Sequence, residues 1–480
     1  MTKPAQSRRA LSCLLTGLVI LSVYPDPAGA AEPISVERYD SLPQRLEAYI
    51  AALNAADFEK MFAFFDDGVT ESYRSRRSEG EDRALYEFLT SDLGQLEIRT
   101  IRRESDEKVT LIAHSAAKDT PVRFLFDIKD ERIDGVAIRL GAPPGETHTL
   151  LNLPRSIDDS MLADRLDKQL QALAAKRKFS GVVLLARQGK PFFHKAYGLA
   201  NRDSGAPNTI STAFDTGSIT KLMTRIAVAQ LLQAGKLSLD GRINDYLPDY
   251  PNGEVARQVT VRQLLDHSSG LGDIFNARWE SASKERYVTP RDFFDLFVND
   301  PLRFAPGSSR SYSNAGFVVL GAIVEAAAGK SFSEYLEANI FSPAGMTRSG
   351  LEKRDGTNPA FAVGYASTGP GGSLVDNLDM LPLQGSPAGS SMHTAEDLLK
   401  LDSALRDGRL LDPNWTAWVY TSDGVREDAG YAIGVAGGAP GVSAGLESNG
   451  TVTVIVLSNF DPPTGEALAR ELYQALETDS

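Results

Sequence analysis

The 480-residue sequence contains one cysteine, Cys13, and it lies close to the N-terminus. The remainder of the chain has no thiol, which excludes a disulfide, a cysteine nucleophile and a thiolate metal site. Histidine is almost as scarce, and its five copies show no paired spacing of the kind that binds metal ions. We therefore expect a protein that works without a metal or any other cofactor.

Positive charge is in deficit. Lysine and arginine number 50 against 63 aspartate and glutamate residues, which gives a formal net charge of −13. Because no basic patch compensates, nucleic acid is not an expected partner. Long apolar runs are missing beyond the N-terminus, which argues against a transmembrane helix in the body of the chain. The 42% hydrophobic content is typical of a globular protein.

Residues 1–30 have the pattern of an export signal. Basic residues near the start are followed by the apolar stretch Leu11–Val23 and by the small-residue cleavage site Ala28-Gly29-Ala30. The apolar stretch is short for a membrane span, although an uncleaved anchor remains the alternative. We expect a signal peptide, no stable membrane insertion after its removal, and a periplasmic or secreted protein.

Three residues carry the chemistry that the sequence offers. Ser218 is followed three residues later by Lys221, and Tyr312 opens the motif Tyr312-Ser313-Asn314. A serine hydroxyl needs a neighbouring base or a stabilising charge before it can attack a carbonyl. The apolar spacing after Ser218 predicts a helix that starts there, with Lys221 one turn along on the same face. The free N–H groups at such a helix start favour developing negative charge.

Both motifs occur twice, so their letters alone decide little. Ser281-Ala282-Ser283-Lys284 also fits Ser-x-x-Lys, and Tyr250-Pro251-Asn252 also fits Tyr-x-Asn. The first copy lies in a charged stretch without an apolar stripe, and Pro251 places the second copy in a turn. The context therefore favours Ser218, Lys221 and Tyr312.

From about residue 180 onward the chain resembles the serine beta-lactamase-like and D-alanyl-D-alanine carboxypeptidase-like superfamily, nearest its class C and esterase branch. The resemblance covers some 300 residues and rests on several blocks in the order of that family. These blocks are Ser180–Leu184, Gly217–Lys221, Leu237–Pro248, Leu264–Leu271, Pro306–Gly307 with Tyr312–Phe317, Pro343–Met346 and Pro387–Gly389 with Thr394–Leu398. It implies an antiparallel sheet flanked by helices plus a helical lobe, and an acyl-enzyme formed at Ser218.

The resemblance also assigns roles. His267 lies in the family block Leu264–Leu271, where a structural hydrogen-bonding role is expected rather than a catalytic one. Lys221 and Tyr312 would move the proton, Asn314 would position the substrate, and backbone N–H groups of Ser218 and of the strand around Gly437 and Gly438 would bind the oxyanion. The third motif of the family, Lys-Thr-Gly or His-x-Gly, is missing: Val435 stands where the basic residue is expected, and no Lys-x-Gly or His-x-Gly follows Tyr312. Without this basic residue, we expect the binding of anionic substrates to weaken by about 1.5–3 kcal/mol, the contribution of one charged hydrogen bond. Val435 can equally be a simple packed strand residue.

A β-hairpin is predicted directly after this region. Its strands are Val442–Glu447 and Thr451–Leu457, with a type I′ turn at Asn449-Gly450. The apolar run of the second strand suits a central position in a sheet covered by helices.

Residues 31–140 form a separate module in the sequence. A helical pattern covers Leu42 to Phe65, and four strands are predicted at Gln95–Arg103, Lys108–Ala113, Pro121–Ile128 and Arg132–Arg139. This α+β order resembles the nuclear transport factor two-like (SnoaL-like) cone fold, and an accessory role is expected. Such cones serve as enzymes, ligand pockets or dimerisation units, so a homodimer through this module is one arrangement that the resemblance allows.

The expected organisation is a signal peptide (1–30), the SnoaL-like module (31–140), a linker (141–156) and a serine hydrolase domain of α+β class (157–480). We expect an exported hydrolase of an ester, an amide or a cell-wall peptide, more esterase-like or peptidase-like than an efficient beta-lactamase. The alternative is a non-catalytic envelope protein that binds cell-wall peptide or a protein partner through the same pocket. The Ser-Lys-Tyr-Asn set favours the enzyme, and the missing third motif favours the binder.

Overall fold

The structure, a computed structural model, describes residues 42–75, 82–83, 86–87, 89–90, 93–115, 117, 120–140, 150–151, 158–367, 373–421 and 432–477. The predicted signal peptide and nearly all of the predicted linker lie outside these residues. The main division between two compact units falls between Leu140 and Gly141. Each unit is described by itself.

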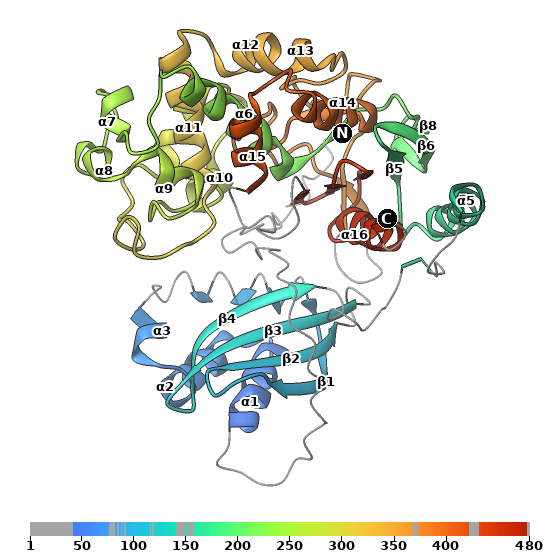
Figure 1. The fold of residues 1–480 in the computed structure, drawn as a ribbon. Coiled ribbons are helices and arrows are strands. Elements are labelled where there is room, and N and C mark those ends of the chain that lie inside the picture. The colour runs from blue at the N-terminus through green and yellow to red at the C-terminus, as the bar shows by residue number, and fades with distance from the viewer. Residues whose placement is uncertain are drawn as a thin grey trace, which may run out of the picture. The chain divides into compact units, whose positions relative to one another are not determined.

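The N-terminal unit contains helices and one four-stranded antiparallel sheet in the order β1-β2-β3-β4 (Figure 1). Its elements are α1 (Leu42–Asn54), α2 (Phe58–Gly68), α3 (Glu71–Ser75), β1 (Leu96–Arg103), β2 (Lys108–Ser115), β3 (Thr120–Lys129) and β4 (Arg132–Leu140). All four predicted strands are confirmed. The single helical pattern divides into α1 and α2, because the side chain of Asp57 caps the start of α2 by accepting a hydrogen bond from the N–H of Glu59.

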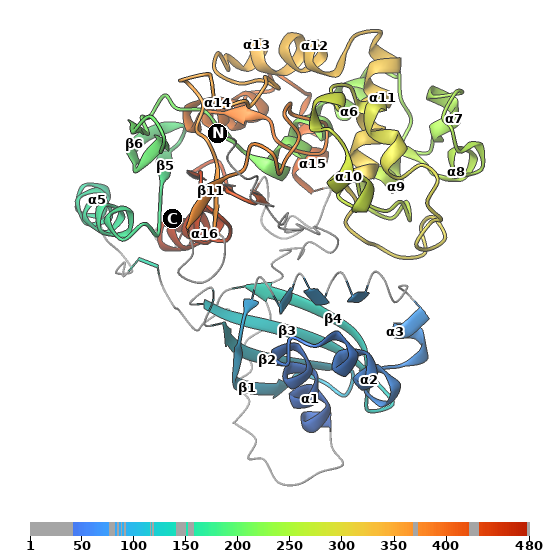
Figure 2. The same cartoon turned by 180° about the vertical axis from the view of Figure 1, so that it is seen from behind.

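The second unit is built on a five-stranded antiparallel sheet in the order β13-β14-β15-β5-β6. The strands are β5 (Gly181–Arg187), β6 (Lys190–Tyr197), β13 (Ile433–Ala439), β14 (Val442–Ser448) and β15 (Val452–Ser458). Every residue of β15 is buried, as its apolar run predicts for a central strand. Helices α5 (Asp159–Ala175) and α16 (Thr464–Glu477) pack on one face of the sheet, through leucines such as Leu166 and Leu472 (Figure 2).

A helical lobe follows in the sequence after the first two strands of this sheet. Its helices are α6 (Thr220–Gln233), α7 (Ile243–Tyr246), α8 (Gly253–Gln258), α9 (Val261–Leu265), α11 (Asn314–Ala328), α12 (Phe332–Leu336) and α13 (Ser342–Ala344), with α10 (Ala277–Ser281) between α9 and α11 in the chain. Helices α6 and α11 are buried along most of their length and pack against each other. The fold is therefore the α+β, beta-lactamase-like arrangement that the sequence predicts.

Short strands and two further helices complete the second unit. They are β7 (Leu199–Asn201), β8 (Ala206–Pro207), β9 (Phe214–Asp215), β10 (Tyr365–Ser367), β11 (Leu374–Asp376), β12 (Met392–His393), α14 (Ala395–Arg406) and α15 (Pro413–Thr421). Strands β9 and β12 pair with each other. This pairing joins the segment before Ser218 to the segment before α14.

One predicted turn is wrong. The sequence predicts a type I′ turn at Asn449-Gly450, which requires a positive φ at both residues. Only Gly450 has a positive φ, of 85°. The side chain of Asn449 instead accepts hydrogen bonds from the N–H groups of Thr451 and Val452, and the N–H of Asn449 donates to the carbonyl of Val452. The turn is therefore centred one residue later, on Gly450-Thr451, because the asparagine side chain competes for the backbone donors.

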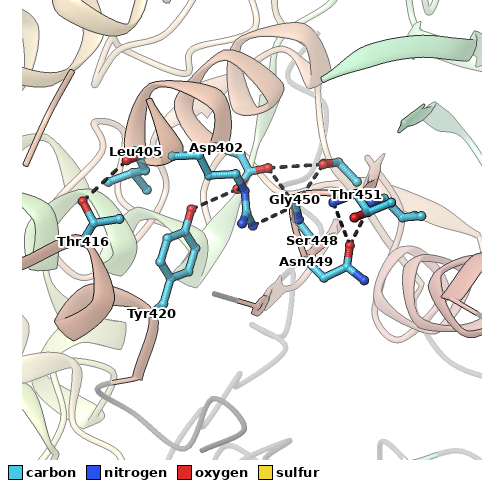
Figure 3. A network of polar contacts seen from close by, with 11 residues as sticks. Asp402, Leu405, Thr416, Tyr420, Ser448, Asn449, Gly450 and Thr451 are labelled. Atoms are coloured by element: carbon cyan, nitrogen blue, oxygen red, sulfur yellow. Dashed lines mark hydrogen bonds and ion pairs between the residues drawn. The ribbon is translucent and has the colours of Figure 1, made fainter. Parts of the chain in front are cut away.

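A buried polar network ties α14 and α15 to this hairpin (Figure 3). The carboxylate of Asp402 accepts hydrogen bonds from Arg406 at 3.0 Å, from Tyr420 at 3.1 Å and from Ser448 at 2.7 Å. The hydroxyl of Thr453 donates to the same carboxylate at 3.2 Å. Because every oxygen of the buried carboxylate is paired, the network fixes α14 against the sheet instead of costing stability.

Among the described residues, no single helix is long and apolar enough to cross a membrane. One pair of consecutive helical segments, α11 and Phe332–Ala344, is long and apolar enough when taken together, but the two segments are bent by 73° relative to each other. The first eleven residues of α11 are buried in the core of the second unit.

Candidate active site

Ser218 lies on a short 3-10 turn, η1 (Gly217–Ile219), directly before α6. The predicted helix therefore exists, but it begins at Thr220 and not at Ser218. Gly217 has a φ of 51°, a conformation that suits glycine, and its N–H donates to the carboxylate of Asp215 at 2.8 Å. The other oxygen of Asp215 lies 3.4 Å from the guanidinium of Arg354, and both side chains are buried. A buried ion pair thus supports the turn that presents the nucleophile.

The ammonium group of Lys221 has three oxygen acceptors. Its Nζ lies 3.2 Å from the Oγ of Ser218 and 2.7 Å from the Oδ1 of Asn314, and it also donates to the carbonyl of Ala388. The Asn314 amide oxygen and the Ala388 carbonyl can only accept, so two N–H groups of Lys221 are used on them and fix its Nζ beside Ser218. Lys221 itself is 6% exposed. The arrangement places the Lys221 amino group directly beside the Ser218 hydroxyl.

The hydroxyl of Tyr312 lies 2.7 Å from the Oγ of Ser218. The tyrosine ring stacks on His267, with ring centroids 4.6 Å apart, and the Nζ of Lys221 lies 4.8 Å from the ring centroid of Tyr312. His267 has a φ of 60°, and its Nδ1 accepts a hydrogen bond from the N–H of Ser313 at 3.2 Å. The histidine therefore has the structural hydrogen-bonding role expected for it, and it fixes the plane of the tyrosine.

Asp273 is a site residue that the sequence motifs do not identify. Its carboxylate accepts hydrogen bonds from the side-chain Nδ2 of Asn314, at 3.1 and 3.0 Å to the two oxygens, and from the backbone N–H of Asn314 at 3.2 Å. This pairing turns the oxygen of the Asn314 amide toward Lys221. Asp273 stands only two residues after the family block that ends at Leu271, so its position was the available signal. Ala388 acts through its carbonyl, which no side-chain letter can indicate.

Strand β13 approaches the nucleophile more closely than a side chain would allow. A Cβ atom at Gly437 would lie 1.9 Å from the carbonyl oxygen of Thr216 and 2.9 Å from the nitrogen of Ser218. A Cβ atom at Gly217 would in turn lie 3.1 Å from the nitrogen of Gly438. Glycine at these positions is therefore required by the contact between β13 and η1.

The N–H of Gly438 faces the outer edge of β13. Ala439 and Val442 close the two-residue turn to β14 and must exchange both backbone hydrogen bonds. The alternation of the ladder then directs the N–H of Gly438 away from β14. The N–H groups of Ser218 and Gly438 thus lie beside each other next to the nucleophile, which is the arrangement of a two-donor oxyanion hole.

Val435 lies two residues before Gly437 and shares its face of β13, the face that meets η1. Its side chain is half-buried. The described part of β13, Ile433–Ala439, contains neither lysine nor histidine. The position therefore adds no positive charge to the site.

The second copies of the motifs have other roles. The hydroxyl of Ser281 donates to the carbonyls of Ala277 and Arg278, one turn back on its own helix. Tyr250 is buried against Phe294, and its burial raises the pKa of the hydroxyl above the ordinary value. Neither copy joins a serine to a lysine and a tyrosine. The structure brings together Ser218, Lys221 and Tyr312 instead.

No group of histidine, cysteine, aspartate and glutamate side chains is placed to hold a metal ion within the described ranges. The reactive groups that the site brings together are the hydroxyls of Ser218 and Tyr312, the amino group of Lys221 and backbone N–H groups. Together they can support nucleophilic attack on a carbonyl, with proton transfer and oxyanion stabilisation in one place.

Comparison with known proteins matches residues 166–478 to the protein family described as Beta-lactamase. The chain is 32% identical to the "Putative penicillin-binding protein PbpX" of Bacillus subtilis (strain 168), over 48% of this chain and 56% of that protein. It is 35% identical to "Esterase EstB" of Burkholderia gladioli, over 44% of this chain and 56% of that protein. The chain thus spans about half the length of the curated relatives it matches.

A solved structure of a penicillin binding protein from Bacillus halodurans is also similar. It superposes with a TM-score of 0.58 at 34% identity, covering 64% of this chain and 98% of that one. The similarity supports the beta-lactamase-like fold assigned from the strand order.

Proposed function

This chain belongs to the beta-lactamase family, and from that premise we propose that it is a serine hydrolase that forms an acyl-enzyme at Ser218. One observation carries the proposal: the Oγ of Ser218 is hydrogen-bonded to both Lys221, at 3.2 Å, and Tyr312, at 2.7 Å. A serine whose oxygen contacts an ammonium and a second proton carrier is equipped for attack on an acyl group.

In the acylation step, Tyr312 acts in its phenolate form beside the Lys221 ammonium and accepts the hydroxyl proton of Ser218, so that the negative charge passes from the phenolate oxygen to the attacking oxygen. In this scheme Lys221 stays an ammonium, and its positive charge stabilises first the phenolate and then the attacking oxygen. The attacking oxygen forms a bond to the carbonyl carbon, and the carbonyl oxygen becomes an oxyanion between the N–H groups of Ser218 and Gly438. Tyr312 then protonates the leaving group.

Deacylation reverses these roles. A water molecule takes the place of the leaving group and gives its proton to Tyr312, and its oxygen attacks the acyl carbon. The oxyanion forms at the same two N–H groups. Collapse of this intermediate returns the proton to Ser218 and releases the acid, so the free enzyme is restored without a cofactor.

The substrate class follows from Val435. A neutral side chain at this position of β13 offers no partner to a substrate carboxylate, and the N–H groups of the oxyanion hole are unaffected by it. We therefore assign the protein an ester or amide substrate without a required carboxylate, in preference to efficient hydrolysis of beta-lactams. A relative named as an esterase, 35% identical, supports this choice.

Export belongs to the same proposal. The pattern of residues 1–30 suggests a periplasmic or secreted enzyme, with the unit before Leu140 as a SnoaL-like accessory module and a candidate dimerisation surface. A cell-wall peptide is then one substrate within reach of the site.

The test is hydrolysis of short-chain nitrophenyl esters, D-amino-acid amides and benzylpenicillin by the full chain and by Ser218→Ala. The proposal predicts ester turnover by the parent and none by the variant. Binding of a cell-wall peptide with equal affinity by both proteins, without turnover by either, would favour a non-catalytic binder.

A further inference from the structure

A chain of buried side chains leads from His393 to the peptide unit that carries the backbone N–H of Ser218. The Nε2 of His393 lies 2.7 Å from the Oγ of Ser391, and this oxygen lies 2.7 Å from the Oγ1 of Thr220. The hydroxyl of Thr220 donates to the carbonyl of Gly217 at 2.8 Å. His393, Ser391 and Thr220 are each fully buried. Nothing in the proposed reaction uses them.

The protons in this chain can be ordered in only one way. The single proton of the Thr220 hydroxyl is used on the Gly217 carbonyl, so the 2.7 Å contact between the two hydroxyls must be bridged by the proton of Ser391. The 2.7 Å contact between Ser391 and His393 then has to be bridged by a proton on Nε2. Each group therefore donates toward the nucleophile, and the oxygen of Thr220 also accepts the N–H of Ser391 at 3.0 Å.

The surroundings of the imidazole agree with this order. The Nδ1 of His393 is buried and has no hydrogen-bond partner among the described residues. A bare acceptor there is less costly than a buried N–H without an acceptor, which favours the Nε2–H tautomer. Burial also lowers the pKa of His393 to about 3, although Asp397 opposes the shift, so the ring stays neutral.

The end of the chain matters because the carbonyl of Gly217 and the N–H of Ser218 belong to one planar peptide unit. Fixing the direction of the carbonyl fixes the opposite direction of the N–H. That N–H is one of the two donors assigned to the oxyanion. Ser391 also holds the other side of the turn, since its carbonyl accepts hydrogen bonds from the backbone N–H and the hydroxyl of Thr216, both at 3.0 Å.

We propose that His393 is a positioning residue, which orients the oxyanion-binding N–H of Ser218 through the one-way chain Ser391–Thr220–Gly217. The proposal rests on the proposed hydrolase function. His393 itself does not contact the substrate. It acts through the hydroxyls of Ser391 and Thr220, which fix the direction of the Ser218 N–H.

The first test is the tautomer of His393 in the full chain, by long-range proton–nitrogen correlation of the imidazole rings. The sequence has five histidines, and the signal missing from His393→Gln assigns the ring. A proton on Nε2 at neutral pH supports the chain, and a proton on Nδ1 overturns it. This readout does not depend on activity.

The second test is the rate at which a fluorophosphonate labels matched variants. Removing an oxyanion donor costs about 10²–10³-fold, so a misdirected donor should slow labelling by about tenfold to 100-fold in Ser391→Ala and His393→Leu. His393→Gln keeps an N–H toward Ser391 and should stay near the parent rate. Ser448→Ala removes an equally buried hydroxyl from the Asp402 network and is the matched control.

In steady-state assays of an ester that the parent hydrolyses, the same variants should lower kcat and leave KM nearly unchanged. Equal slowing by Ser448→Ala and Ser391→Ala, or a normal rate for His393→Leu, would overturn the positioning role. If the fluorophosphonate does not label the parent protein at all, the hydrolase function is contradicted. The tautomer of His393 would still show whether the hydrogen bonds of the chain run toward Gly217.

Discussion

The Oδ1 of Asn314 lies 2.7 Å from the Nζ of Lys221, and Asp273 keeps it there by binding the nitrogen of the same amide. The asparagine thus connects a buried carboxylate to the ammonium beside the nucleophile. The three groups form a chain of alternating acceptors and donors, in which the charge of Asp273 offsets the charge of Lys221 through one neutral side chain.

Replacing the carboxylate should disturb this chain. Asp273→Ala leaves the buried amide nitrogen of Asn314 without an acceptor, so we expect a loss of about 1–3 kcal/mol in the free energy of unfolding, measured in urea. Fluorophosphonate labelling of Ser218 should slow as well, because the amide oxygen is no longer directed at Lys221. The control is Asp249→Ala, which removes an exposed carboxylate paired with Arg291. An Asp273→Ala protein as stable and as reactive as the parent would contradict the role given to Asp273.

Tyr312→Phe removes one hydroxyl and keeps the ring that stacks on His267. Since general acid–base groups contribute about 10²–10⁴-fold, ester hydrolysis should fall by that factor. The melting temperature should change little, because the ring contacts remain. Tyr246→Phe is the matched control: its hydroxyl accepts a hydrogen bond from the N–H of Ser238, away from the site. Comparable activity of Tyr312→Phe and Tyr246→Phe would exclude Tyr312 as the proton carrier.

Val435→Lys restores a cation on the face of β13 that meets η1. Benzylpenicillin carries a carboxylate, and a hydrogen bond to a charged group contributes about 1.5–3 kcal/mol. We therefore expect the rate of acylation by benzylpenicillin to rise by about tenfold or more. Hydrolysis of a neutral ester should change much less. Val435→Met, a long side chain without charge, separates the effect of size from that of charge. An equal change with both substrates, or an equal gain in Val435→Met, would show that Val435 does not set the preference.

The sequence predicts the fold well because the signals for it are local. The apolar run of β15 and the four strands of the N-terminal unit could be located from hydrophobic pattern alone. The β14–β15 turn was misplaced by one residue, since the outcome depends on whether the side chain of Asn449 or the backbone takes the available donors. Such a competition leaves no periodic pattern.

The site was predictable in part for a similar reason. Ser218, Lys221, Tyr312 and Asn314 stand in motifs with a defined spacing, and the structure brings them together. Asp273 and the carbonyl of Ala388 reach the site only through tertiary contacts. A backbone oxygen has no signature in the sequence.

Glu471 on α16 links stability to pH. Its carboxylate accepts hydrogen bonds from the N–H groups of Leu150 and Leu151 at 2.8 and 3.0 Å, and burial, the largest effect, raises its pKa from 4.5 to about 7. Between these two values the folded protein binds more protons than the unfolded chain, so the free energy of unfolding should fall as the pH rises toward 7. The difference between the two pKa values corresponds to about 3 kcal/mol, and the partial exposure of Glu471 to solvent reduces it to on the order of 2 kcal/mol.

Glu471→Gln removes the titrating group, and the difference in unfolding free energy between variant and parent should therefore depend on pH. Urea unfolding from pH 4.5 to pH 8 measures it: relative to the variant, the parent should lose stability across the range and level off above about pH 7. A difference that stays constant with pH would mean that Glu471 does not titrate between these values.

The most direct measurement of the central claim is the intact mass of the full chain after incubation with a fluorophosphonate, beside Ser218→Ala and Ser281→Ala. The hydroxyl of Ser218 contacts the amino group of Lys221 and the hydroxyl of Tyr312, whereas the hydroxyl of Ser281 is used on carbonyls of its own helix. A single adduct on the parent and on Ser281→Ala, and none on Ser218→Ala, is the result that the account predicts. An unmodified parent that is demonstrably folded, or an adduct that persists in Ser218→Ala, would contradict it.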